Sequence, residues 1–364
     1  MIRQLHRWLG VVIAAWLAVA TLSGLALLWA DEYVDWRYPQ LPETVPEPSP
    51  DGAVIALITD AAGGQLTALG MPRPGRPAYH AYLADGGERL YHPETGVAVA
   101  EWGWTDSLPA FLFELHSYLL AGDPGHTLVG ILGCLALVSL LTGSWLWLRR
   151  RAVFRLRYFW PRTGESRHLL RGHAAQGATL GLAFAGLVLT GVAMVFPDPF
   201  RSSLNVLLGA QPPFAPGAAT VEAGSTAVDW PRVLGAAAAA FPAGTVRFVS
   251  PPRRAGDPVV VRLRNEGELH PNGRSYAVVH PGTGEVMESI DASRRGAGPA
   301  VFDAFYPLHA GKTGWPGYRL LLTLLSLSLL YVAGSGMLLF LRGRRVRRTP
   351  RRRSASGLHA ERGR

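Results

Sequence analysis

The sequence predicts a membrane α-helical bundle of four transmembrane helices with an internal twofold repeat, carrying two external α+β domains. Three observations predict this fold class. Four apolar runs lack Asp, Glu, Lys and Arg over the length of a bilayer-spanning helix. Two polar segments between them are each long enough for a small domain. Histidines and glycines recur at constant spacing in the two halves of the 364-residue chain.

The apolar runs divide the chain into eight segments. We expect transmembrane helices at 1–30, 126–148, 174–197 and 317–341, external domains at 31–125 and 198–316, and basic segments at 149–173 and 342–364. The first run could instead be a cleaved signal peptide, because its start is basic and Leu28-Trp29-Ala30 resembles a cleavage site. Its apolar run is long for such a peptide and shares its spacing with an internal helix. We therefore interpret it as a retained span.

Charge predicts the orientation in a bacterial inner membrane. Residues 149–171 hold eight Arg and one Glu, and residues 342–364 hold ten Arg and one Glu. Residues 31–125 hold four Arg against fourteen Asp and Glu. Because short Arg-rich segments stay in the cytoplasm, both termini are expected inside and both large polar segments outside. The net charge of +10 is therefore mainly a topology signal and is weak evidence for nucleic-acid binding. Arg351-Arg352-Arg353 could also contact anionic membrane lipid.

Several kinds of chemistry are poorly supported. Cys134 is the only cysteine, which excludes an intramolecular disulfide and a cysteine-ligated metal cluster. The sequence has no Walker-type loop, no His-Glu-x-x-His and no Gly-x-Ser-x-Gly motif. Asp and Glu are absent from the spans, which argues against a carboxylate-based proton-coupled transporter.

The external segments show the same pattern twice. After a proline-rich linker at 37–51, the first segment predicts a helix at 54–62 and strands near 65–70, 78–84, 88–92 and 97–101. The second predicts a helix at 229–241 and strands near 245–249, 258–264, 275–280 and 285–290. We therefore expect one helix and one small antiparallel sheet in each domain. Amphipathic stretches at 107–121 and 299–311 precede the second and fourth spans and predict helices on the outer membrane face.

Four histidines keep their register across the halves. His116 and His309 are separated by 193 residues, as are Arg149 and Arg342 at the ends of the spans that follow. His6 and His173 are separated by 167 residues, and so are the Ser23-Gly24 and Thr190-Gly191 doublets that follow them. Parallel repeats are related by an axis along the membrane normal. Such an axis brings His6 towards His173 on the cytoplasmic side and His116 towards His309 on the external side.

Several of these segments resemble a known family. The His-Arg-Trp-Leu-Gly start of the first span, the Leu115-His116 to Gly125 run and Leu141-Thr142-Gly143 near the end of the second span are similar to the PepSY-associated transmembrane family, also called iron-regulated membrane proteins. The Pro-x-Thr-Gly turns at 93–96 and 281–284 resemble PepSY-type domains. The resemblance extends to about residue 345, and its specificity lies in the ordered set of spans, turns and histidines.

The resemblance implies a redox function, because some family members are similar to ferric-siderophore reductases with b-type haem in the bundle. Neutral imidazole is a good iron ligand, and haem iron accepts two axial histidines. We therefore expect His6 with His173, and His116 with His309, each to hold the iron of one haem b. Arg7 and Arg171 would pair with propionates of the inner haem. The expected function is electron transfer from a cytoplasmic donor to an external ferric siderophore or another ferric chelate for iron acquisition.

Two alternatives remain open. The histidines could be interfacial polar residues without a ligand role, since each lies near the end of a span. The protein could also be a non-enzymatic PepSY membrane protein that binds a peptide, a protease or a partner protein. The remaining histidines have less support as ligands: His80, His92, His126, His168, His270, His280 and His359.

Overall fold

The structure is a computed structural model that describes every residue except 43–49, 151–157, 161–162, 209–220, 222–226 and 349–364. Residues 43–49 of the predicted proline-rich linker and residues 151–157 and 161–162 of the Arg-rich loop lie outside the described residues, as do Arg351-Arg352-Arg353 and His359.

Four long helices are apolar enough to cross a membrane. They are α1 (Ile2–Leu27), α5 (Gly122–Arg150), α6 (Ser166–Val195) and α10 (Pro316–Arg348). α1 packs against α5 and α10, and α6 packs against the same two helices, so the four form a closed bundle. α6 and α10 run past the uncharged stretches that predict them, because arginines at a helix end can extend their side chains towards water without ending the helix. His173 consequently lies inside α6, two turns after its start.

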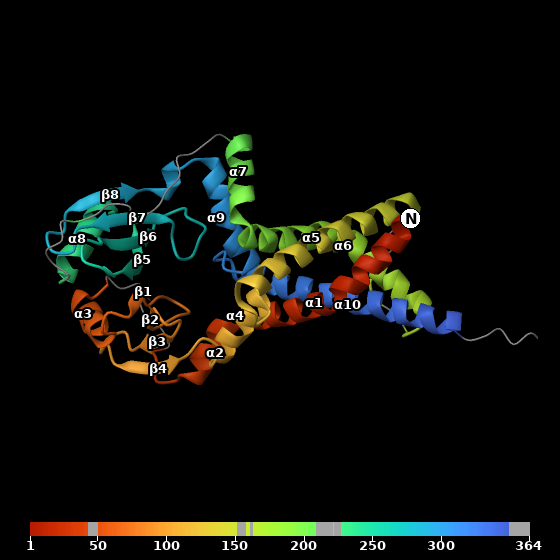
Figure 1. Cartoon of the computed structure of the whole chain (residues 1–364), viewed down its shortest axis with the longest axis horizontal. Coiled ribbons are helices and arrows are strands. Elements are labelled where there is room, and N and C mark those ends of the chain that lie inside the picture. The colour runs from red at the N-terminus through yellow and green to blue at the C-terminus, as the bar shows by residue number, and fades with distance from the viewer. Residues whose placement is uncertain (43–49, 151–157, 161–162, 209–220, 222–226, 349–364) are drawn as a thin grey trace, which may run out of the picture.

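Both large polar segments lie at the same end of the bundle (Figure 1). The N-terminus and the last turns of α10 lie at the opposite end. One end of the bundle therefore carries the sheet, and the opposite end carries the N-terminus.

The strands form one sheet rather than the two separate sheets that the sequence predicts. Its order is β4-β3-β2-β1-β5-β6-β7-β8. The join is antiparallel pairing of β1 (Leu66–Gly70) with β5 (Thr245–Ser250), through Leu69 with Val249 and Gly70 with Phe248. The prediction of separate sheets was wrong because the first strand of each half would otherwise present an open edge, and pairing the two edges satisfies their backbone groups.

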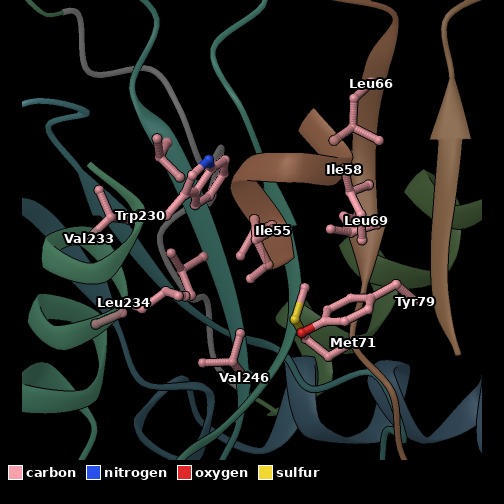
Figure 2. Packing of buried hydrophobic residues seen from close by; sticks show 14 of the residues in the cluster. Ile55, Ile58, Leu66, Leu69, Met71, Tyr79, Trp230, Val233, Leu234 and Val246 are labelled. Atoms are coloured by element: carbon pink, nitrogen blue, oxygen red, sulfur yellow. The ribbon is translucent and has the colours of Figure 1, made fainter. Parts of the chain in front are cut away.

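The other strand positions follow the sequence closely, because alternation of apolar and polar side chains is a strong local signal. These strands are β2 (Tyr79–Leu83), β3 (Glu88–Tyr91), β4 (Ala98–Trp102), β6 (Val259–Arg264), β7 (Ser275–Val279) and β8 (Val286–Ile290). The helices α3 (Gly52–Ala61) and α8 (Trp230–Ala240) cover the face away from the bundle (Figure 1). Their Ile55, Ile58, Trp230 and Val233 form one core with strand residues such as Leu69 (Figure 2).

Short helices connect the sheet to the bundle. Two were predicted as amphipathic helices, and are α4 (Leu108–Tyr118) and α9 (Ala297–His309). Two others, α2 (Ala30–Arg37) and α7 (Pro197–Leu208), were not predicted. The prolines at 197 and 199 look like a helix break, but proline is well tolerated in the first turn, where its missing N–H would have no helical partner. α2 places Val34 and Tyr38 against the small core around Leu90.

Candidate functional site: two histidine pairs in the bundle

The structure brings together both histidine pairs that the spacing predicts. His6 of α1 and His173 of α6 have ring centroids 6.2 Å apart. His116 of α4 and His309 of α9 have ring centroids 6.0 Å apart. The first pair, here the inner pair, lies at the end of the bundle that carries the N-terminus, and the second, the outer pair, lies at the end that carries the sheet (Figure 1).

The two pairs are separated by most of the thickness of a bilayer. His6 lies near the start of α1, whereas the ring of His116 lies against Gly24 of the same helix. At 1.5 Å per residue these positions are about 27 Å apart along the helix axis. The hydrocarbon core of a membrane is about 30 Å thick. The arrangement therefore puts one pair near each membrane face.

Each imidazole is oriented by a backbone carbonyl of another long helix. The Nδ1 atoms of His6, His116, His173 and His309 lie 3.0, 2.9, 2.9 and 3.0 Å from the carbonyl oxygens of Ser139, Ala20, Val332 and Leu187. A carbonyl oxygen only accepts hydrogen bonds, so Nδ1 carries the proton in each ring. The lone pair is then on Nε2, which is the tautomer that a metal-binding histidine with an Nδ1 hydrogen bond adopts.

The same three-part contact occurs at all four rings. The carbonyl belongs to residue i, a hydroxyl to residue i+3, and a glycine to residue i+4, so all three share one helix face. The four sets are Ala20, Ser23 and Gly24 in α1; Ser139, Thr142 and Gly143 in α5; Leu187, Thr190 and Gly191 in α6; and Val332, Ser335 and Gly336 in α10. Thr142, Thr190 and Ser335 each donate to the carbonyl that the ring also uses. Ser23 donates to the Val19 carbonyl at 2.7 Å and lies 3.2 Å from the Ala20 carbonyl.

These glycines make room for the imidazoles. A Cβ atom added to Gly24 would lie 2.9 Å from Cε1 of His116, and one added to Gly143 would lie 3.0 Å from Cε1 of His6. A Cβ atom added to Gly191 would lie 3.1 Å from Cε1 of His309, and one added to Gly336 would lie 3.2 Å from Cε1 of His173. Close approach of α5 and α6 depends instead on Gly130 and Gly133, where a Cβ would collide with Phe196 and Val192 side chains.

Gly24→Ala is expected to displace His116 and weaken cofactor binding at the outer pair. Alanine favours a helix by about 1 kcal/mol over glycine, so lost binding would not reflect a weaker helix. The measurement is haem per polypeptide after purification, with thermal unfolding to confirm the fold. Gly186→Ala is the control, because a Cβ there meets nothing within 4 Å. Equal haem retention in both variants would contradict the assignment.

The outer pair lies at a cavity of about 970 Å³. Its walls include His116, His309, Gly24 and Gly191, and it continues from the bundle to the sheet. Burial lowers the pKa of His116, and burial together with the neighbouring His116 lowers the pKa of His309 to about 4. Both imidazoles are therefore neutral at pH 7, which is the form that binds iron.

The residues present fit a haem with two axial histidines. Metal–nitrogen bonds of about 2 Å, plus about 1.2 Å from each nitrogen to its ring centre, place two axial imidazole centroids about 6.4 Å apart. The observed separations are 6.0 and 6.2 Å. No group of three or more His, Cys, Asp or Glu among the described residues could hold a bare metal ion. Two imidazoles suit a metal whose other positions are filled by a macrocycle.

The other described histidines have local partners. His126 belongs to neither pair. Its Nδ1 donates to the carbonyl of Ser117, 3.0 Å away, and its ring stacks on Tyr118. His168 bonds Thr163, and His92 and His280 accept backbone N–H groups of their own turns. His80 pairs with Glu88, and His270 pairs with Arg274. None of these residues joins a histidine pair.

The comparison with protein families is decisive for classification. A family model described as "PepSY-associated TM region" matches residues 3–342. The chain belongs to this family. The match contains all four long helices and all four paired histidines, so this PepSY-associated protein is a multi-pass membrane protein. No match was found among curated proteins.

Sequence reasoning missed the hydroxyls and carbonyls that orient the imidazoles in this PepSY-associated protein. The available signal was a Ser-Gly or Thr-Gly doublet in every span: Ser23-Gly24, Thr142-Gly143, Thr190-Gly191 and Ser335-Gly336. A doublet of that kind is common in packed membrane helices, where small residues lie between helices. Only the fold shows that each doublet faces a histidine.

Proposed function

We propose that this protein binds two haem b groups and passes electrons across the bacterial inner membrane to a ferric siderophore or another ferric chelate outside. The single observation that carries the proposal is the shared environment of four histidines, which form two pairs near opposite membrane faces. Haem iron supplies a one-electron couple that amino-acid side chains lack at such sites. The reaction consumes one electron per Fe(III) and yields Fe(II).

The residues of the chain hold and orient the proposed sites. His6 and His173 would hold the inner haem, and His116 and His309 the outer haem. The carbonyl contacts keep each Nε2 unprotonated and restrict rotation of the ring. Such restriction reduces the reorganisation that a change in iron charge would otherwise demand.

The inner site also has cations nearby for propionates. Arg7 lies with its guanidinium 5.6 Å from the Phe340 ring centre, and Arg171 lies 5.1 Å from the Tyr158 ring centre. Stacking on an aromatic ring leaves the guanidinium edges able to bind carboxylates bidentately. An unidentified cytoplasmic reductant would donate at this end.

Orientation and internal repeat belong to the same proposal. The Arg-rich sequences 149–171 and 342–364 support a cytoplasmic location for both termini, and the sheet would then lie outside. The constant spacings support an internal twofold repeat. Each half provides one imidazole to each pair and orients its own two imidazoles from its own helices.

The visible spectrum of the purified protein is the first test. We expect protein from haem-replete cells to show the absorption of low-spin haem with two axial histidines, with about two haems per polypeptide. Reduction by dithionite should sharpen the spectrum, and addition of a ferric chelate should reoxidise it. A colourless preparation would overturn the proposal and favour a PepSY membrane protein that binds a peptide or partner.

A further inference from the structure

Four cations, Arg37, Arg73, Arg76 and Lys312, line the cavity that contains the outer histidine pair, and the last three act on one carboxylate, Asp31. Arg73 and Arg76 lie in the turn between β1 and β2, and Lys312 follows α9. These segments are distant in sequence. The fold brings all three side chains to the wall of the cavity that His116 and His309 also line. Arg73, Arg76 and Lys312 form the cation cluster.

The turn forces two of the cations together. The backbone groups of Arg73 and Arg76 exchange two hydrogen bonds, of 3.0 and 2.9 Å. Pro74 and Gly75 occupy the two central positions, and Gly75 has a φ of 74°, which suits a type II turn. Residues directly opposite on two strands point to the same side, and like charges there repel. A tight turn with an arginine at each side therefore concentrates positive charge.

Arg73 is held by neutral groups. Its guanidinium donates to the carbonyl of Pro271 at 3.2 Å and to Oδ1 of Asn272 at 2.8 Å. Burial, followed by the charges of Arg76 and Arg247, lowers the pKa of Arg73 to about 10. The group is still a cation at neutral pH. Its neighbours fix its position without neutralising its charge.

Of the five carboxylates that line the cavity, Asp31, Glu88, Glu101, Asp106 and Glu114, only Asp31 forms an ion pair with the cluster among the described residues. Asp31 lies 3.7 Å from Arg76 and 3.3 Å from Lys312, so one carboxylate serves two cations. Glu88 is bonded to His80 at 2.6 Å, and Glu101 to Arg89 at 2.9 Å. Among the described residues, no carboxylate lies close enough to Arg73 to form an ion pair, although Asp31 acts on it at longer range. Glu114, which also lines the cavity, is on α4 beside His116 rather than at the turn.

We propose that the cation cluster binds carboxylate groups in the outer cavity, as part of an anionic, carboxylate-bearing ferric chelate or of the outer haem. A guanidinium presents two parallel N–H donors to a carboxylate, and the unbalanced charge at this site would be relieved by an anion. The walls beside the cluster include Tyr82 and Trp102, which offer flat surfaces to the body of such a ligand. The inference rests on the proposed function for the identity of these two carboxylate sources.

The test uses full-length purified protein and a redox-inert probe. Gallium(III) citrate carries carboxylates and cannot be reduced under these conditions, so its binding does not require electron transfer. An uncharged gallium trihydroxamate is the comparison ligand. Affinity is measured by isothermal titration for the parent, Arg73→Gln, Lys312→Gln and the charge-retaining Arg73→Lys. Arg232→Gln is the matched control, because Arg232 is paired with Asp229 and neither residue lines the cavity.

If the carboxylates belong to a chelate, Arg73→Gln should weaken gallium citrate binding by roughly tenfold or more. Arg73→Lys should retain most of the affinity, and Arg232→Gln all of it. Trihydroxamate binding, haem content and the haem spectrum should not change. Added salt should weaken the citrate complex only modestly, because the cluster is mostly buried and buried charges are screened less than exposed ones.

If the carboxylates belong to the haem, Arg73→Gln should lower haem retention or shift the reduction potential of the outer haem. In that case neither the parent nor the variant should bind gallium citrate. The proposal is overturned if Arg73→Gln and Lys312→Gln change neither citrate affinity nor haem properties while thermal unfolding matches the parent. If the protein binds gallium citrate but reduces no ferric chelate, the proposed carboxylate site stands and only the proposed reductase function is refuted.

Discussion

Replacing His309 with alanine is expected to leave the purified protein with about half of its parental haem, because one of two paired sites loses an axial ligand. His116→Ala should have the same effect, since both rings would hold one iron. The carbonyl of Leu187 keeps its bond from Thr190, so the variant leaves α6 intact. The measurement is extracted haem per polypeptide, with the spectrum of the remaining haem.

His126→Ala is the control for the outer pair. His126 also lines the cavity, but its ring bonds Ser117 and stacks on Tyr118. It should keep the parental haem content. Full haem in His309→Ala, with normal thermal stability, would show that the outer pair has a packing role only.

The second large effect is expected at the inner pair. His6→Ala or His173→Ala should abolish reduction of an external ferric chelate by electrons supplied from inside, while the outer haem remains bound. The reason is distance: the pairs lie about 27 Å apart along the helix axis, too far for the outer site to receive electrons directly from a cytoplasmic donor. The assay is chelate reduction by sealed vesicles of defined orientation, with the reductant enclosed.

His168→Ala is the matched control for the inner pair. It lies in the same helix as His173, and its ring bonds Thr163 at 2.6 Å. It should reduce the chelate at the parental rate. If the His6 and His173 variants also match the parent, the inner pair is structural and transmembrane electron transfer through it is refuted.

Much of the local structure was predictable. The strands near 258–264 and 275–280 were located because alternating side chains mark a half-buried strand, and the structure has β6 at Val259–Arg264 and β7 at Ser275–Val279. The helix α7 was not predicted, because Pro197 and Pro199 disguise a helix start as a break. The constant spacings predicted which histidines would meet, and the short centroid distances agree with that pairing.

The environment of the histidines could not be predicted in the same way. Gly24 and Gly191 were visible as small residues, but the sequence does not say whether a glycine faces another helix, lipid or a side chain. The ring of His116 reaches Gly24 from a position 92 residues along the chain. Such a contact depends on how α4 returns to the bundle, which is a property of packing rather than of local composition.

The sequence by itself determined the four spans, the likeness of the two polar segments and the identity of the paired histidines. These depend on apolar length, charge distribution and spacing, all of which act along the chain. Only the tertiary structure decided that β1 and β5 join into one sheet, that a carbonyl, a hydroxyl and a glycine surround each imidazole, and that Arg73 and Lys312 share a cavity with the outer pair. These features arise where open strand edges and helix faces from distant segments must satisfy one another, and no single segment contains the partner that it will meet.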